Sequence, residues 1–399
     1  MSNEKNINQS NSFIKHIHLE NYKSILKADI SLTNLNILIG ANGAGKSNFI
    51  SFFAFLQQMQ KENLRNYVLS KGGQDAFLYY GIKQSNYLAA TVKFIANGME
   101  RLDFGADVSY DISLQSTNDG FFKFNYEKIL SHEPNGDEAY VANLNNSSYE
   151  SQIENLSHIA YGKAKDKTFD SANSVDLASA MALLYRNYCL AIQVFHFHDT
   201  SDSSPLKSIV NKDDNLFLRS DGANIAAMLK LVYDKHPEYY RLIIDTVRMV
   251  VPDFHDFVIR DTEFITLEWF NKNNVDIPWK AYYLSDGSLR FIALAILLLM
   301  PTELQPKTII IDEPELGLHP SAINILSGLI KRAANELQVI ISTQSPALLA
   351  NFEPQDIIVV DKKDKFSEFK RLNKEDLNTW LEDFSLPQLW DMNVIGGRP

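Results

Sequence analysis

Eight residues, GANGAGKS at positions 40 to 47, have the residue types and spacing of a phosphate-binding loop. They follow the apolar segment LNILI and precede NFISFFAFLQQMQ, whose apolar positions recur at helical spacing, so the order is strand, loop, helix. Amides of such a loop surround a β-phosphate, Lys46 can reach the β and γ oxygens, and the Ser47 hydroxyl can hold Mg²⁺. A chance glycine-rich turn is the alternative, which the flanking elements disfavour. The predicted ATP-binding residues are Asn42, Gly43, Ala44, Gly45, Lys46, Ser47 and Asn48.

Two adjacent carboxylates, Asp312 and Glu313, end the apolar run TIII. Ionised side chains at the end of a buried strand are costly unless each has a partner or a task. Asp312 fits the coordination shell of Mg²⁺, and Glu313 fits a base that orients the water attacking a γ-phosphorus. A helix cap before Pro314 is the structural alternative.

A polar run, Ser285 to Ser288, stands directly before the apolar segment from Phe291 to Met300. The serine hydroxyls, the small Gly287 and the free amides of a helix start could together hold an anion. An ordinary helix N-cap is the alternative. Asp286 is unexpected beside an anion, and its role stays open.

The segment VFHFHDTS at 194 to 201 carries His196 and His198 at alternate positions, followed by Asp199. This spacing could ligate a metal ion, with His198 or Asp199 near Mg²⁺ or an attacking water. Packing histidines at a strand end are the favoured alternative.

The elements that must position these residues differ between the two halves of the chain. Alternating residues predict one strand over 13–25, a hairpin around Asn97-Gly98 and a strand over 120–130. The polar stretch 130–172 is interpreted as long loops or an insertion. Helical periodicity predicts further helices at 175–190, 222–235 and 237–250.

The last 120 or so residues alternate strand and helix, which predicts a parallel sheet covered on both faces. Its expected strands are KTIIIDEP, QVIISTQ and DIIVVD, and a helix begins near Ser288. Ligands of such sheets lie beyond the carboxyl ends of the strands, where Asp312 and Gln344 are found.

Composition limits the class of protein. Of 399 residues 45% are apolar and 22% charged, as in a folded protein with a sizeable core. The single Cys189 excludes an internal disulfide and favours a reducing cytoplasm. The longest apolar run is about half of what a bilayer span needs, so no membrane association is expected. A net charge of −11 argues against a large basic face and leaves room for a local basic strip.

The phosphate loop, Asp312-Glu313, LSDGS and GLHP together resemble the motifs of soluble ABC-type P-loop ATPases of the RecF, SMC and OLD kind. More narrowly, the chain is similar to the stand-alone, RecF-like AAA-family ATPases of bacterial anti-phage defence operons, and the closing LWDMNVIGGRP resembles the end of that group. The likeness is strongest at both ends. It implies an α/β ABC-type ATPase head with an antiparallel β-subdomain, a helical subdomain and a parallel core sheet.

The resemblance implies a role for a second copy of the chain. The residues matching the signature segment, Ser285, Asp286, Gly287 and Ser288, would bind the γ-phosphate of ATP held by the partner copy. Gly317, Leu318 and His319 would form the loop that crosses the dimer seam. Transporter ATPases differ at this loop, which favours the soluble branch.

The resemblance also implies roles within one copy. Gln344 stands at the switch position, where many relatives carry histidine. Its amide can donate a hydrogen bond but cannot take a proton charge, so slow turnover is expected. Tyr22, Lys23 and Ser24 match residues near the nucleotide base. Gln74 and Gln84 are the candidates for the glutamine loop.

The expected organisation is a disordered tail (1–12), a first ATPase lobe (13–205), a helical and hairpin connection (206–280) and a second lobe (281–399). The expected function is a cytoplasmic ATPase with ATP and Mg²⁺ as cofactors and Glu313, Lys46 and Gln344 as catalytic residues. It would close as a homodimer or higher oligomer and gate a separate nuclease-like or toxin-like effector from a neighbouring gene. A RecF-like ATPase that binds DNA in repair is the alternative, and a transporter motor is disfavoured.

Overall fold

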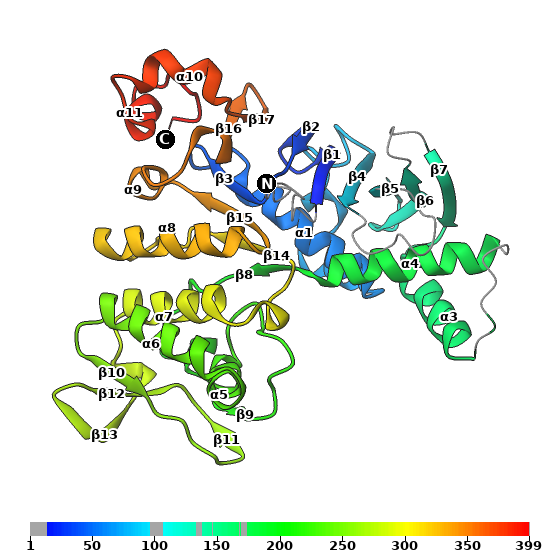
Figure 1. The fold of residues 1–399 in the computed structure, drawn as a ribbon. Coiled ribbons are helices and arrows are strands. Elements are labelled where there is room, and N and C mark those ends of the chain that lie inside the picture. The colour runs from blue at the N-terminus through cyan, green and yellow to red at the C-terminus, as the bar shows by residue number, and fades with distance from the viewer. Residues whose placement is uncertain are drawn as a thin grey trace, which may run out of the picture. The chain divides into compact units, whose positions relative to one another are not determined.

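The computed structural model describes residues 14–95, 107–132, 138–145, 147–166, 168 and 174–398. The chain divides into two compact units, whose elements are labelled in Figure 1. Unit 1 holds the chain up to Ile192 together with 355–373 and the residues from Met392 onward, and unit 2 holds 193–354 and 374–391. The predicted tail 1–12 lies outside the described residues.

Unit 1 contains an antiparallel sheet with the order β2-β1-β4-β5-β6-β7 among the described residues. Its strands are β1 (Ile14–Tyr22), β2 (Ile25–Ser31), β4 (Tyr87–Ile95), β5 (Asp107–Ser116), β6 (Phe122–His132) and β7 (Glu138–Asn145). Alternate residues of β4 are buried, the pattern of a strand with one covered face. The predicted antiparallel pair is confirmed for β4 and β5, while the Asn97-Gly98 turn lies outside the described residues.

The strand predicted over 13–25 is confirmed for Ile14–Tyr22 and wrong at its end, because the chain turns back there. Strand β1 pairs antiparallel with β2, and Tyr22 lies opposite Ile25. Asn21 and Lys23 reach this turn with positive φ angles of 57° and 51°. Glycine usually marks such a conformation in a sequence. Since neither residue is glycine, the apolar alternation runs through the turn unbroken.

The interpretation of 130–172 as loops is also wrong for its described part. Besides β7, the region contains α3 (Ile153–Lys165), which packs against α4 (Ser174–Leu190) (Figure 1). The fully buried Glu127 holds the start of α3, because its carboxylate accepts hydrogen bonds from the Tyr110 hydroxyl at 2.7 Å and the Gln152 amide at 3.0 Å. The polar composition reflected exposed faces of regular elements.

Unit 1 also holds the strand that leads into the phosphate loop. All five residues of β3 (Leu35–Ile39) are buried. The strand pairs in parallel with β16 (Ile357–Lys363), which pairs antiparallel with β17 (Phe366–Arg371). Helix α1 (Lys46–Gln60) follows the loop. The predicted strand, loop and helix are therefore confirmed.

Aromatic side chains fill the core around α1. The Tyr22 ring centroid lies 5.5 Å from that of Phe52 and 5.9 Å from that of Phe55, both in edge-to-face geometry. Phe55 in turn lies 5.2 Å from Phe77. Such contacts fix α1, and with it the end of the phosphate loop, against the β1–β2 hairpin.

Unit 2 has a parallel pair, β14 (Thr308–Asp312) and β15 (Gln338–Thr343). The other strands of unit 2 or at its boundary are β8 (Ile192–Phe195), β9 (Val210–Asn211), β10 (Phe254–Phe257), β11 (Phe264–Ile265), β12 (Glu268–Asn271) and β13 (Asn274–Lys280). Its helices are α5 (Ile225–Lys235), α6 (Pro237–Val250), α7 (Asp286–Leu299), α8 (Pro320–Ala334), α9 (Pro346–Leu349), α10 (Lys374–Leu381) and α11 (Leu386–Asp391). The alternation of strand and helix predicted after Ser288 is confirmed.

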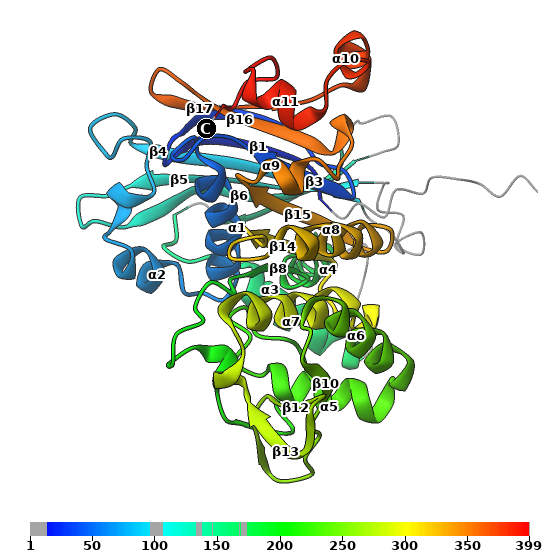
Figure 2. The same ribbon diagram turned by 90° about the vertical axis from the view of Figure 1, so that its left-hand side faces the viewer.

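Helix α7 lies between α8 and α6 (Figure 2), which explains why it is buried from Leu289 to Leu299. The apolar residues of α7 are therefore those of a core helix within unit 2. No helix of the described chain is long and apolar enough to cross a bilayer.

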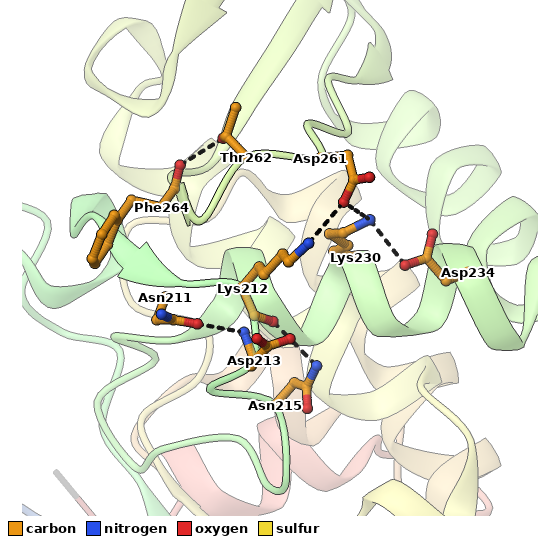
Figure 3. A network of polar contacts seen from close by, with 9 residues as sticks. All are labelled: Asn211, Lys212, Asp213, Asn215, Lys230, Asp234, Asp261, Thr262 and Phe264. Carbon is orange, nitrogen blue, oxygen red and sulfur yellow. Dashed lines mark hydrogen bonds and ion pairs between the residues drawn. The ribbon is translucent and has the colours of Figure 1, made fainter.

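The β9–β11 ribbon is joined to α5 by exposed ion pairs (Figure 3). Lys212 contacts Asp261 at 3.0 Å, Lys230 contacts the same carboxylate at 3.6 Å, and Lys230 also contacts Asp234 at 2.9 Å. Exposed pairs of this kind contribute little to stability. They orient the ribbon more than they hold unit 2 together.

Candidate functional site

The phosphate loop of unit 1 surrounds a buried lysine. Lys46 is 4% exposed, and its Nζ donates hydrogen bonds to the carbonyl oxygens of Gly40 at 2.7 Å and Ala41 at 3.1 Å. Neutral carbonyls are weaker partners for an ammonium than an ionised phosphate is. The side chain is therefore already turned into the loop, where an anion would be its better acceptor.

Glycine is required at two positions of this loop. A Cβ on Gly45, whose φ is 121°, would lie 2.1 Å from the Ser367 Oγ, and a Cβ on Gly40 would lie 2.2 Å from the carbonyl oxygen of Val360. No side chain fits these positions without moving β16 or β17. The sequence pattern therefore has a steric cause in this chain.

A hydroxyl network braces the loop from the side of β17. Ser367 Oγ donates to the carbonyl of Ala44 and lies 2.7 Å from Ser24 Oγ. Asn48 Nδ2 donates to Ser24 Oγ at 2.7 Å. Ser24 and Asn48 thus have their side chains in this network beside the loop, and their contact with a nucleotide stays a prediction. Ser367 was missed because a lone serine far along the chain carries no motif.

Tyr22, predicted to lie near the nucleotide base, has a fully buried side chain. Tyr22 is 0% exposed within the aromatic core, and its hydroxyl bonds to Ser51 Oγ at 2.9 Å. Lys23 Nζ donates to the same Ser51 oxygen at 2.8 Å, and burial lowers the pKa of its ammonium. Tyr22 is a core residue, whereas Lys23 is half-buried and lies in the β1–β2 turn.

The two glutamine candidates have different surroundings. Gln74 is buried in a single turn (Gln74–Ala76), donates to the Thr117 carbonyl at 3.0 Å and accepts from the Thr117 amide at 3.2 Å. Both ends of its amide serve this structural link, and a role for Gln74 as a ligand residue stays a prediction. Gln84 is exposed, so a functional role for it stays a prediction.

Unit 2 places the two predicted carboxylates at the end of β14. Asp312 is opposite Ser342 of β15, and the Ser342 hydroxyl donates to its Oδ1. Glu313 has a φ of 46°, and its amide donates to the Ser342 carbonyl at 2.8 Å. This left-handed conformation is uncommon for a glutamate and turns the chain sharply after the strand.

The predicted switch residue touches the predicted base. Gln344 Nε2 donates to Glu313 Oε1, so the amide positions the carboxylate without taking its proton. Glu315, which the motif search missed, accepts from Thr343 Oγ1. Burial raises the pKa of the Glu315 carboxyl, and its Oε2 is buried with no hydrogen-bond partner. Two glutamates of the DEPE run therefore hold the 343–344 segment.

The signature segment begins α7 as an N-cap. Ser285 Oγ accepts from the Ser288 amide at 3.2 Å, and a Cβ on Gly287 would lie 2.5 Å from the carbonyl oxygen of Gly317. The N-terminus of α7 thus packs against the predicted seam loop. Asp286 is exposed in the first turn, where a carboxylate is favoured by the helix dipole, and its charge acts on Arg290.

Arg290 is a buried cation that sequence reasoning missed. It is 6% exposed, and its guanidinium donates to the carbonyls of Phe197 at 3.0 Å, His198 at 3.0 Å and Leu316. Burial lowers the pKa of Arg290, and Asp286 partly offsets this shift. One side chain therefore connects α7, the seam loop and the segment after β8.

The seam loop and the 194–201 segment have local structural roles. His319 is exposed and caps α8, since its ring accepts from the Ser321 amide at 3.3 Å. Leu318 is half-buried beside Gly317, whose φ of 76° suits glycine. Asp199 caps a turn by accepting from the Ser201 hydroxyl and amide, which lowers its pKa.

Within the described ranges, no group of three or more histidines, cysteines and acids could hold a metal ion. His196 is exposed and His198 is half-buried, so a metal-binding role for the 194–201 segment stays a prediction. Magnesium needs a different kind of site, with few protein oxygens and several waters or phosphates. The hydroxyl of Ser47 and the carboxylate of Asp312 are hard donors of the right type.

Comparisons with known proteins agree with these motifs. A family model described as "AAA domain, putative AbiEii toxin, Type IV TA system" matches residues 35–350. The "Retron Ec83 probable ATPase" of Escherichia coli is 23% identical over 398 residues, covering 88% of this chain and 72% of the relative.

Solved structures of Smc heads have a similar fold. One, an SmcHead bound to the C-winged helix domain of ScpA, matches with a TM-score of 0.55 and 15% identity, covering 91% of this chain and 99% of the other. A second, the Smc head domain with an extended coiled coil bound to the C-terminal domain of ScpA from Pyrococcus furiosus, matches with 0.53 and 16%, covering 93% and 99%. The predicted α/β P-loop fold of the ABC-type ATPase head is confirmed.

Proposed function

Because the chain belongs to the family of AAA domains described as putative AbiEii toxins of type IV TA systems, we propose that it is an ATPase that closes on ATP as a dimer and gates a separate effector protein. The coarse function, a P-loop ATPase, follows from the family and the fold. The dimer, the effector and a defence role are the proposed part.

The contact between Gln344 and Glu313 carries the hydrolytic part of the proposal. A carboxylate held by a neutral amide at a strand end can accept a proton from water while keeping its orientation. Lys46 would hold the β and γ phosphates, and Glu313 would orient the attacking water. Mg²⁺, held by Ser47 and Asp312, would neutralise phosphate charge. Turnover is expected to be slow, since Gln344 cannot carry a proton charge.

The exposed N-terminus of α7 supports closure with a second copy. Ser285 and Asp286 are exposed, and the amides at the start of α7 offer the positive end of a helix dipole to an anion. The γ-phosphate of ATP bound by a partner copy is such an anion. An isologous pair would use this surface twice.

The comparisons support an effector in trans. The two Smc heads are each described as bound to a domain of another protein, ScpA. The Escherichia coli relative is a retron ATPase. We therefore propose that nucleotide-driven closure changes the activity of a partner from a neighbouring gene, in the cytoplasm, as part of anti-phage defence.

Light scattering with and without the β,γ-imido analogue of ATP and Mg²⁺ tests this proposal. We expect the mass to double with the analogue, because a non-hydrolysed nucleotide keeps the two copies closed. Ser285→Arg should bind the analogue normally but stay monomeric, since the larger side chain blocks the partner's phosphate. Ser70→Arg, on an exposed turn of α2 (Leu64–Ser70), is the matched control and should dimerise.

Calorimetric titration with the same analogue measures binding, and phosphate release from ATP with and without duplex DNA measures hydrolysis. Failure of the wild type to bind the analogue would contradict the ATPase. Binding without a change of mass would contradict the closed dimer. ATP hydrolysis stimulated by duplex DNA would instead favour the RecF-like alternative.

A further inference from the structure

The closing segment, which we define as Met392 to Arg398, lies against the first residue of the phosphate loop. An ideal Cβ on Gly397 would lie 3.4 Å from the Cα of Gly40 and 3.6 Å from the carbonyl oxygen of Ile39. Both partners belong to unit 1, as does the closing segment. The carbonyl of the same Gly40 accepts the shorter hydrogen bond from Lys46, at 2.7 Å. The segment therefore packs on the part of the loop that holds the lysine.

Its position is fixed by contacts that leave no room for side chains. Gly396 and Gly397 have φ angles of 81° and 67°, and a Cβ on Gly397 would lie 2.8 Å from Val359 Cγ1. The Gly397 amide donates to Asp361 Oδ2 at 3.0 Å, and Ile395 is 7% exposed. An anchored side chain, a hydrogen bond and two close-packed glycines hold the segment in one place.

The next residue is a cation without a partner. Arg398 is exposed and forms no ion pair or hydrogen bond with any other residue of the described chain. Its Cα follows that of Gly397 by about 3.8 Å, so the backbone of Arg398 is held close to the loop as well. A guanidinium is always charged and binds phosphate oxygens through paired N–H groups. The chain therefore carries a charged residue next to Gly397, whose backbone packs on the loop.

We propose that the closing segment is part of the nucleotide site, with Gly396 and Gly397 seating it against Gly40 and Arg398 binding the nucleotide's phosphates. This inference rests on the proposed function, because it assumes that the loop binds ATP. It adds a ligand-binding residue that lies more than 350 positions from the loop in the sequence. The alternative is that the closing segment only packs on the loop and does not bind the nucleotide. That alternative makes a different prediction, because packing needs the glycines and not the charge of Arg398.

Calorimetric titration of the full chain with the β,γ-imido analogue of ATP and Mg²⁺ separates these interpretations. Arg398→Ala should weaken binding about 10-fold, the usual effect of losing one charge-assisted contact. Arg398→Lys should lose less, because it keeps the charge and only loses the paired geometry. Arg241→Ala, on α6, is the matched control and should bind as the wild type does. Arg241 is also exposed and forms no ion pair or hydrogen bond with another described residue.

The thermal midpoint of each variant is measured alongside affinity. Arg398→Ala should leave it unchanged, since the side chain is exposed, and an affinity loss that appears only with a fall in midpoint would overturn the direct contact. Equal affinity of Arg398→Ala and wild type would overturn the inference and leave the proposed ATPase intact. Absence of binding by the wild type would instead defeat the proposed function.

A second pair of variants tests the packing of Gly397 against the phosphate loop. Gly397→Ala would place a Cβ against Val359, whereas Gly120→Ala, at a similar φ of 87°, would meet nothing within 4 Å. Both carry the strain of a positive φ, so their difference isolates the crowding. We expect Gly397→Ala to weaken analogue binding more than Gly120→Ala does. Equal binding by the two variants would refute the claim that packing of Gly397 against the loop supports nucleotide binding.

Discussion

The phosphate loop of unit 1 and the carboxylate cluster of unit 2 are built on different principles. In the loop, the residues are consecutive and their conformation is enforced by steric contacts, as at Gly40 and Gly45, where a Cβ would collide with β16 or β17. In the cluster, side chains that are some 30 residues apart hold one another by hydrogen bonds, as Gln344 holds Glu313.

This difference predicts how each half fails. A site whose shape is enforced by close contacts is damaged when atoms are added to it. A hydrogen-bonded site is damaged by the loss of a donor, an acceptor or a charge, even when shape is kept. Isosteric substitutions should therefore affect the carboxylate cluster most, and added methyl groups should affect the loop most.

Glu313→Gln is expected to have the largest effect. It keeps the shape but removes the base, so the rate of ATP hydrolysis should fall by about 10²- to 10⁴-fold while the affinity for ATP is retained. Phosphate release under saturating ATP measures it. Glu336→Gln, at an exposed site after α8, should hydrolyse at the wild-type rate. Normal hydrolysis by Glu313→Gln would mean that another group is the base.

Lys46→Ala should weaken ATP binding on the order of 100-fold, because the buried ammonium is the strongest cation available to the phosphates in the loop. Equilibrium binding of a labelled ATP measures the loss. Lys165→Ala, which removes an exposed lysine of α3, is the control. Retained affinity in Lys46→Ala would refute the assignment of the loop.

Gly287→Ala tests whether unit 2 also contains a steric contact of the loop type. The added methyl would meet the carbonyl of Gly317 at 2.5 Å, so the free energy of unfolding should fall by about 1–3 kcal/mol. Gly328→Ala, on α8 with nothing within 4 Å, should instead raise it by about 0.4–1 kcal/mol. Denaturant unfolding compares the two. Similar stabilities would show that α7 can shift away from the seam loop.

Glu315→Gln should have the smallest effect, and its sign depends on pH. Burial raises the pKa of Glu315 above its ordinary 4.5, so the folded state binds the proton more tightly than the unfolded chain. Stability of the wild type is therefore lost as pH rises from that value through the folded pKa. Glutamine does not ionise, so the thermal midpoint of the variant should gain on that of the wild type as pH rises. A constant difference across this range would contradict the shift.

Regular elements were predicted well where apolar periodicity was long, as in α6 and α7, and poorly where polar or aromatic residues interrupted it. The β1–β2 turn was missed because Lys23 takes a positive φ without a glycine. Helix α3 was missed because it lies in a stretch rich in Asn, Ser, Asp and Gly. Strand β17 and helices α10 and α11 had no predicted counterpart. Their residues carry too few periodic apolar positions to stand out.

The candidate site divides in the same way. Lys46, Asp312, Glu313 and Gln344 were predicted because they lie in short motifs beside apolar strands. Ser367, Glu315 and Arg290 were missed because each acts through contacts that only folding creates. Tyr22 shows the converse, since a residue near a motif can belong to the core.

The sequence alone determined the local chemistry: an eight-residue loop that can hold a phosphate, and a strand that ends in two carboxylates. Both are encoded within a few residues, because backbone geometry at a strand end depends on its neighbours in the chain. The tertiary structure decided which distant groups complete the loop, such as Ser367, which donates to the Ala44 carbonyl, and the closing segment, which packs on Gly40. These contacts depend on strand pairing and burial across hundreds of residues, which no local pattern records.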